Sequence, residues 1–295
     1  MKTKNKPAKL QKPFAEYRAI TPFYKLALYK ESRKAVFGMI KNIWNSFVVI
    51  QQKQKYGLTK IPVVNVEHPL DQHIPFTPYR VKIYLDFVWF FCRIMAMMLK
   101  KLDNKDSIPF CAGFVSFIGD LYSKAGSIYS TTLTTTNRPK YYGSPKFVLI
   151  HATDPHLLCV PSLHVAIVAG TWAYVRKFLS ETEFLKDEKD KILEQIYFGA
   201  VKITESVLYV KQHSINCVSG AMYMLTSAFE KNFFSEDDAK TFLDKLFENA
   251  EDIFPQDVQE IHAYTKEFYS SLLKENKKSQ LWQQPLLNWL NNYGN

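Results

Sequence analysis

The chain has 295 residues, carries a formal net charge of +10 and contains 47% hydrophobic residues but only 10 glycines. A chain of this length can bury a large core as one domain or two. The scarcity of glycine argues against a turn-rich β fold and predicts an all-α fold of helices packed on helices. The positive charge favours anionic partners, but the lysines are dispersed and no arginine-rich block occurs, so we do not expect nucleic acid among them.

The cysteines and the first residues bear on where the protein works. The four cysteines form no C-x-x-C pair and lie in apolar surroundings: Cys92, Cys111, Cys159 and Cys217. We therefore expect buried free thiols in a reducing compartment rather than disulfides or a metal site. The basic N-terminus lacks the apolar stretch of a secretory signal, so we expect a cytoplasmic or membrane-associated location.

The pattern along the chain divides it into three parts. Residues 1–70 form an N-terminal segment that is expected to be loosely ordered over 1–30 and helical over 32–55. Residues 71–231 contain the long apolar stretches and are expected to form the main helical bundle. Residues 232–295 mix acidic and basic residues, as is typical of a soluble amphipathic extension. The helices expected within the bundle cover residues 81–101, 108–130, 162–179, 196–213 and 214–229.

None of the apolar stretches is suited to cross a bilayer. A spanning helix needs about 18 or more nearly uncharged residues. The stretch 81–99 contains charged residues, the stretch 165–175 is short and is followed by Arg176, and the stretch 214–229 is rich in Ser, Asn and Gly. We therefore expect a soluble protein or a peripheral contact with a membrane.

Three short motifs follow one another in the middle of the chain. They are Arg138-Pro139 in TTTNRPK, Pro-Ser-Leu-His ending at His164 in CVPSLHVAIVAG, and a later His213 in SVLYVKQHSINCVSG. This order resembles the type 2 phosphatidic acid phosphatase superfamily, which shares its helical bundle with bacterial acid phosphatases and vanadium haloperoxidases. The form Pro-Ser-Leu-His is most similar to the branch with lipid phosphotransferases and sphingolipid-type synthases. The resemblance implies a helical bundle of this type with extra N- and C-terminal helices.

The resemblance also implies a role for each motif residue in phosphoryl transfer. Arg138 would hold the phosphate with a bidentate fork. Ser162 and the backbone N–H of Leu163, at the start of the following helix, would bind further oxygens. His164 would be the general acid, and His213 the nucleophile that carries a phosphohistidine, later passed to water or an acceptor alcohol. No metal or other cofactor is required, and the expected partner is a phosphorylated small molecule or a lipid phosphate.

The chain departs from the family pattern at two basic positions. Thr131 stands where the family has the lysine of the first motif, and Lys140 is the candidate that would replace it from the other side. Val207 stands where the family has the arginine of the third motif. Lys211 lies four residues further on and would supply the charge from nearly the same face of the helix expected over 196–213.

A third departure concerns the carboxylate that orients the nucleophilic imidazole. Cys217 occupies its position, and the neighbouring Asn216 is the candidate left to orient His213. Ser206 and His213 are seven residues apart, which on one helix places them on the same face. We therefore expect the motif residues to meet around one pocket that is large enough for an oxyanion.

Several alternatives remain open from the sequence. The altered positions also suit a catalytically impaired helical module that binds phosphate or anionic headgroups, and the pocket would also suit vanadate-dependent halide oxidation. A lone histidine such as His164 is often a structural residue satisfied by a backbone carbonyl. The stretch HATDPH, residues 151–156, predicts a substrate-contacting loop, with a metal site as the alternative. The sequence predicts nothing about the oligomeric state.

Overall fold

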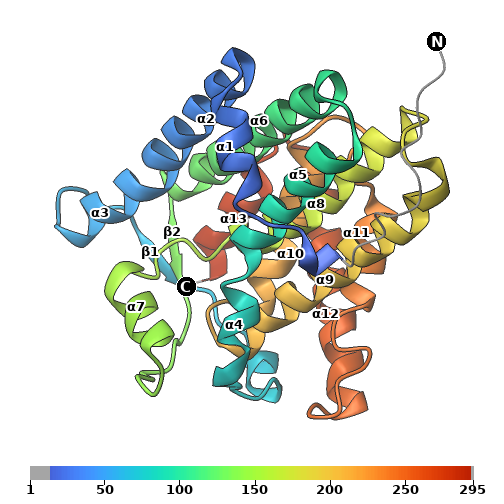
Figure 1. The fold of residues 1–295 in the computed structure, drawn as a ribbon. Coiled ribbons are helices and arrows are strands. Elements are labelled where there is room, and N and C mark those ends of the chain that lie inside the picture. Colours follow the sequence, from blue (N-terminus) through green and yellow to red (C-terminus); the bar gives the residue numbers. More distant parts are fainter. Residues whose placement is uncertain (1–13, 294–295) are drawn as a thin grey trace.

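The computed structural model describes residues 14–293, in which almost all regular structure is helical (Figure 1). This confirms the predicted all-α helical bundle. The elements, in chain order, are η1 (Phe14–Glu16), α1 (Thr21–Ala27), α2 (Lys30–Ile43), the π-helical turn η2 (Trp44–Val48), α3 (Val49–Lys55), β1 (Val63–Asn65), η3 (Pro69–His73), η4 (Pro78–Arg80), α4 (Val81–Tyr84), α5 (Phe87–Lys101), α6 (Asn104–Tyr129), β2 (Leu133–Thr135), α7 (Pro145–Thr153), α8 (Leu163–Ser180), η5 (Lys186–Glu188), α9 (Lys189–Tyr209), α10 (Ile215–Ser227), α11 (Glu236–Asp244), α12 (Pro255–Asn276) and α13 (Gln284–Tyr293).

Helix α8 lies within the bundle, where it packs against α5, α6, α9 and α10 (Figure 1). Every residue over 165–171 is buried, as expected for a helix that is apolar on all sides. A Cβ atom at Gly170 would lie 2.8 Å from Cζ of Phe117 on α6, so the glycine permits the close approach of these two helices. The start of α8, which carries the second motif, is thereby fixed inside the molecule.

Helix α2 and the turn η2 lie along α6. Two glycines of α6 permit this contact. A Cβ atom at Gly119 would lie 2.9 Å from Cα of Met39, and one at Gly126 would lie 2.4 Å from Cβ of Ser46. Asn42 Nδ2 also donates to the backbone oxygen of Gly119 over 3.1 Å. One face of α2 is therefore fixed to α6, and other positions along α2 are exposed.

A pair of short parallel strands, β1 and β2, anchors the segment that leads into α8. Thr134 in β2 accepts through Oγ1 from the backbone N–H of Cys159 over 2.9 Å and from that of Val160 over 2.8 Å. Tyr129, the last residue of α6, donates through its hydroxyl to the backbone oxygen of Pro161 over 2.5 Å. These bonds fix the chain just before the first turn of α8.

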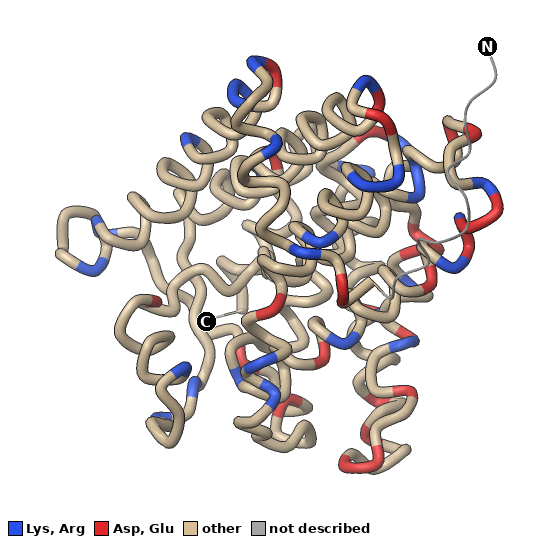
Figure 2. The backbone as a smooth tube through the Cα atoms, in the orientation of Figure 1, with Lys and Arg blue, Asp and Glu red and all other residues tan. Residues whose placement is uncertain are grey.

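The C-terminal helices pack on α10 and share its hydrophobic core. Asn216 in α10 donates through Nδ2 to the backbone oxygen of Val66 and to the Tyr293 hydroxyl, both over 3.1 Å. Its Oδ1 accepts from the Tyr264 hydroxyl over 2.7 Å. Residues 236–293 thus form helices, as the sequence predicts, and they lie directly against the bundle. Acidic residues are frequent on α11 and α12 (Figure 2).

Three segments differ from the sequence-based expectation. Residues 14–27 form η1 and α1 instead of a loose segment, because Pro22 and Leu26 are buried; residues 1–13 lie outside the described range. The helix expected over 81–101 is interrupted between α4 and α5. Helix α7 occupies a stretch that the sequence predicts to be a link and a loop.

Over residues 14–293, no helix is both long and apolar enough to traverse a bilayer. Helix α6, with 26 residues, has Asp106 in its first turn and also carries Asp120 and Lys124. For these residues the structure confirms the expectation that no apolar stretch is suited to cross a bilayer.

Candidate functional site

The histidines of the second and third motifs meet at the start of α8. Ser162 caps α8, so His164 lies in its first turn, whereas His213 lies in the loop between α9 and α10. Nε2 of His213 and Nδ1 of His164 are 3.3 Å apart, within hydrogen-bonding distance. The ring centroids are 5.4 Å apart and the ring planes are inclined by 64°. The fold therefore brings together two side chains that are 49 residues apart in the sequence.

Aromatic side chains hold the ring of His164. Tyr84 stacks on it with a centroid distance of 4.7 Å, and Phe87 contacts it edge-on at 4.3 Å. Burial lowers the pKa of His164 to about 3; His213 acts in the same direction, whereas Asp154 opposes it. His164 is therefore neutral near pH 7, with one ring nitrogen as a donor and the other as an acceptor.

His213 is 8% exposed, and its Nδ1 atom is buried without a hydrogen-bonding partner. Burial lowers the pKa of His213 to about 3, and His156 adds to this effect. The backbone of Cys159 acts in the opposite direction and raises the pKa, although it makes no hydrogen bond to Nδ1 within the usual distance and angle limits. Both rings are thus neutral, and one of the two facing nitrogens donates to the other. When His213 carries its proton on Nδ1, its Nε2 lone pair faces His164.

Asp71, on η3, fixes the loop that carries His213. Its Oδ1 accepts from the backbone N–H of Ile215 over 2.9 Å, and its backbone oxygen accepts from Nζ of Lys211. The chain turns sharply here, because Lys211 has a φ of 53° in the left-handed region. Asp71 is therefore a positioning residue for His213. The sequence shows it only as an acidic residue in a proline-rich connector, without its distant partners.

A helix was expected over 196–213, but α9 ends at Tyr209, so the prediction is wrong for residues 210–213. Ser206 and His213 therefore do not share a helical face, and Ser206 Oγ donates to a backbone oxygen within α9 over 2.7 Å. Lys211 binds Asp71 instead of lining the histidine pocket. Burial lowers the pKa of Lys211, and Asp71 opposes this shift. The structure thus gives no support to Lys211 as a phosphate ligand.

Arg138 lies beside the pocket but is held by other groups. Its Nη1 lies 3.3 Å from Oδ2 of Asp154 and 3.3 Å from Oε1 of Gln212, and its Nη2 donates to the backbone oxygen of Asp154 over 3.1 Å. Because Gln212 precedes His213, the guanidinium contacts the immediate neighbour of the candidate nucleophile. Lys140 is exposed and does not line the pocket, so it does not take the place of the missing lysine.

The remaining predicted residues differ in what they contact. Ser162 is a helix cap: its Oγ accepts from the backbone N–H of Val165 over 3.4 Å, and its own N–H donates to the backbone oxygen of Cys217 over 3.2 Å. Leu163 lines the pocket. The prediction for Asn216 is wrong, because its amide binds Val66, just after β1, and side chains of α12 and α13 rather than the nucleophilic ring.

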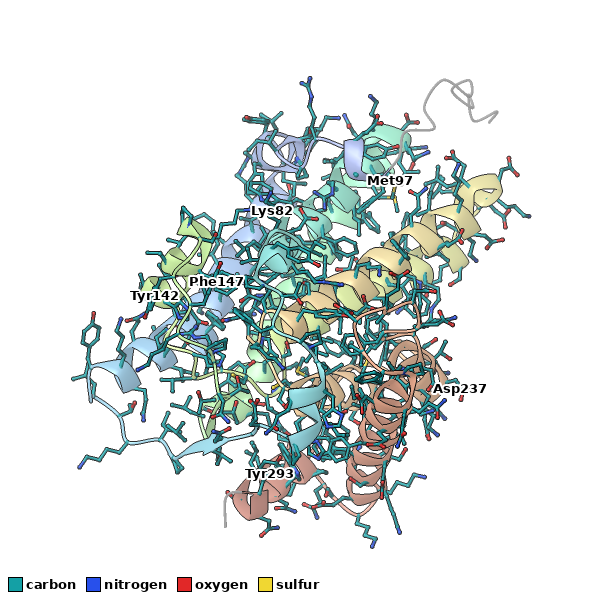
Figure 3. The ribbon with its side chains drawn as sticks, turned by 90° about the horizontal axis from the view of Figure 1, so that it is seen from below. Lys82, Met97, Tyr142, Phe147, Asp237 and Tyr293 are labelled. Carbon is teal, nitrogen blue, oxygen red and sulfur yellow. The ribbon has the colours of Figure 1, made fainter. Side chains whose placement is uncertain are left out.

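A pocket of about 320 Å³ surrounds the two histidines. Helix α7 borders the pocket with Ile150 and Thr153. Figure 3 shows Tyr142, which is exposed, at the outer edge of the molecule and Phe147, which is buried, further in. The volume suffices for a phosphate with part of an apolar group. The other lining residues are Phe47, Gln51, Tyr84, Leu85, Phe87, Tyr122, Ile150, Thr153, Asp154, His156, Leu158, Cys159, Leu163 and Gln212.

Cys159 and His156 both line the pocket, and the sequence did not predict that they contact each other. Cys159 Sγ lies 3.8 Å from Nε2 of His156, and this nitrogen lies 2.7 Å from Oγ1 of Thr136. Burial raises the pKa of the Cys159 thiol, but the neighbouring Cys217 thiol, His156 and Arg138 outweigh it and hold the pKa below its usual range. All four cysteines are free and buried, as predicted, and Cys159 is the one whose pKa is lowered.

The stretch 151–156 contributes to the pocket but forms no metal site. Asp154 and His156 line the pocket, whereas His151 belongs to α7 and lies against Tyr142 at a centroid distance of 5.1 Å. Within residues 14–293, no group of three or more His, Cys, Asp or Glu side chains could hold a metal ion. The substrate-contacting interpretation of this stretch therefore stays a prediction for Asp154 and His156.

Comparisons with known proteins yield no match: no family model, no curated protein and no solved structure is similar to the chain. The functional interpretation therefore depends on the motif residues and on the geometry of the pocket. That geometry is a pair of neutral histidines, in contact at the N-terminus of a buried helix, with an arginine beside them.

Proposed function

We propose that the protein is a metal-independent phosphatase or phosphotransferase that acts on a phosphate monoester or a lipid phosphate through a phosphohistidine on His213. The observation that carries this proposal is the contact between His164 and His213 over 3.3 Å inside one pocket. Two imidazoles in contact supply the nucleophile and the proton donor that phosphoryl transfer requires. The order of the motifs also supports the proposal, because it resembles that of the phosphatidic acid phosphatase superfamily.

The transfer would proceed in two balanced steps. In the first, the phosphate enters between the two rings and their hydrogen bond opens, which frees Nε2 of His213. Nε2 then attacks phosphorus, the P–N bond forms, the P–O bond to the leaving group breaks, and His164 gives a proton to the departing oxygen. In the second, water or an acceptor alcohol attacks phosphorus, the P–N bond breaks, and His164 takes the proton of the attacking oxygen. Both histidines thus return to their initial state.

The protonation states fit these roles once an anion is bound. His213 is neutral above a pKa of about 3, so its lone pair is available over the physiological range. The pKa of His164 is also about 3. A phosphate dianion beside the ring would raise it, since an opposite charge nearby favours the protonated imidazole. Substrate binding would therefore create the general acid.

The groups for binding the phosphate come from α8 and Arg138. The first N–H groups of a helix have no partner inside the helix and face an anion favourably, and both Leu163 and His164, in the first turn of α8, line the pocket. Arg138 would exchange its contact with Asp154 for the phosphate, which carries more charge than one carboxylate. The apolar walls of the pocket suit a phosphate attached to a hydrocarbon group, and this favours a lipid phosphate.

The test is phosphate release from purified protein. An activated aryl phosphate should be hydrolysed, and vanadate should inhibit, because it mimics the trigonal-bipyramidal transition state. His213→Ala should abolish turnover. His164→Ala should abolish turnover of alkyl phosphates but retain part of the activity toward the aryl phosphate, whose leaving group needs no proton. His73→Ala is the matched control, since His73 lies on η3 outside the pocket. Wild-type rates in both pocket variants would exclude the proposal.

A second candidate function is a catalytically impaired module that binds phosphate or anionic headgroups. The observation that favours it is the pairing of Arg138 with Asp154, together with Cys217 at the position of the orienting carboxylate. Calorimetry with inorganic phosphate distinguishes the two candidates. Binding that is lost in Arg138→Gln, without turnover of any phosphate ester, would support the module.

A further inference from the structure

The N-terminal helices leave an unusual number of large apolar side chains in contact with solvent. On and beside α2, Phe37 is 76% exposed, Ile40 is 53% exposed and Trp44 is 59% exposed. Large exposed apolar patches on a soluble domain indicate an interaction surface. The other exposed apolar residues of this region are Ile20, Phe23, Tyr24, Leu28, Tyr56 and Leu58.

These side chains lie together because of the helical repeat. Phe37, Ile40 and Trp44 follow one another at spacings of three and four residues, which places them on one side of α2. Met39 and Ser46 lie against α6 instead. The apolar side is therefore not part of the α2–α6 contact.

Basic residues accompany the apolar ones. Between residues 21 and 60, Glu31 is the one acidic residue. Figure 2 shows the contrast with α11 and α12, where acidic residues are frequent. The positive charge of the chain is thus concentrated on the same elements as the exposed apolar side chains. The basic residues of this stretch are Lys25, Lys30, Arg33, Lys34, Lys41, Lys53, Lys55 and Lys60.

A groove of about 410 Å³ opens beside this apolar side, between α1–α2 and α5–α6. The exposed rings of Phe23 and Phe37 belong to its lining. At its other end, Phe87 and Tyr122 line both the groove and the histidine pocket. The groove and the histidine pocket thus adjoin at these two rings.

We propose that the surface of α1–α3 docks on an anionic phospholipid bilayer, with the exposed side of α2 in the headgroup region. Aromatic and aliphatic side chains enter the boundary between headgroups and acyl chains, while the surrounding lysines bind lipid phosphates and carboxylates. This combination of apolar and basic groups on one surface matches a membrane better than a second, equally basic copy of the chain, which would be repelled. If the proposed function holds, the groove receives the hydrocarbon part of a lipid phosphate whose headgroup reaches the histidines.

The experiment is sedimentation of the full chain with large vesicles, without any substrate. Vesicles of phosphatidylcholine with phosphatidylserine should bind the protein, vesicles of phosphatidylcholine alone should bind it more weakly, and salt should reduce the binding. The triple variant Phe37→Ser, Ile40→Ser and Trp44→Ser should lose about tenfold or more of the vesicle affinity. Its matched control is Phe254→Ser with Leu281→Ser, which removes exposed apolar residues from the α12–α13 region.

Two outcomes would overturn the docking proposal. One is equal vesicle binding by the triple variant and by wild type, with circular dichroism showing both folded. The other is a dimer in lipid-free solution that the triple variant abolishes, which would identify a second copy as the occupant. Because the assay measures binding without turnover, failure of the phosphatase proposal would leave its result unchanged.

Discussion

The buried histidine at position 213 makes the stability of the fold depend on pH in a specific way. Burial lowers the pKa of His213 to about 3, whereas an unfolded histidine has a pKa of about 6.5. Because the folded-state pKa is the lower one, the stabilising contribution is fully present above the unfolded pKa. It is lost progressively as the pH falls from about 6.5 towards about 3.

The magnitude follows from the two pKa values. At pH 5 the unfolded chain binds a proton at this position in most molecules, whereas the folded chain does not. The difference of about 1.5 pH units below the unfolded pKa corresponds to about 2 kcal/mol, at 1.36 kcal/mol per unit. The side chain is 8% exposed, so solvent screens this effect little. His213 alone should therefore lower the free energy of unfolding by about 2 kcal/mol between pH 7 and pH 5.

Urea unfolding of wild type and His213→Gln at the two pH values measures this contribution. Glutamine does not titrate, so the variant should lose about 2 kcal/mol less than wild type between pH 7 and pH 5, and the titrating groups that are distant from position 213 cancel. Thr171→Val, at a buried position without a titratable group, is the control and should lose as much as wild type. Equal losses in wild type and His213→Gln would refute the assignment of a buried neutral imidazole.

Two further predictions concern the thiols and the packing of α2. Iodoacetamide at pH 7 should label Cys159, whose pKa is lowered, in preference to Cys92 and Cys111, whose pKa values are raised by burial to about 12. Digestion and mass spectrometry locate the label, and uniform labelling would contradict the lowered pKa of Cys159. Gly126→Ala should lower stability by about 1–3 kcal/mol because its Cβ atom meets Ser46 in η2. Gly38→Ala, with no atom within 4 Å of the new Cβ, should be neutral or stabilising in thermal unfolding, and an equal loss in both variants would contradict the close contact.

The sequence predicted the fold class and most helices because they follow from local periodicity. The stretch that became α8 is apolar on all sides, and α2 to α3 follow a helical repeat, so burial and helix formation agree. The break between α4 and α5 and the early end of α9 could not be predicted in this way. The end of α9 depends on contacts of Lys211 with Asp71, which is 140 residues away in the sequence.

The site was predicted in part for a similar reason. The motifs named His164 and His213, and the fold brings these two together. The supporting groups were predicted from their distance to the motif residues along the chain, and such a prediction fails where the chain turns. Asn216 binds the C-terminal helices, and Lys140 is exposed. Asp71, which holds the loop of the nucleophile, could be recognised only from the folded structure.

The proposed phosphohistidine is tested most directly by detecting the phosphoryl group on His213. Protein mixed with an activated aryl phosphate, quenched in alkali to preserve a P–N bond and analysed by mass spectrometry, should carry one phosphoryl group on the peptide that contains His213. The adduct should be lost in acid and absent from His213→Ala. An adduct on another residue, or turnover that persists in His213→Ala, would contradict the account.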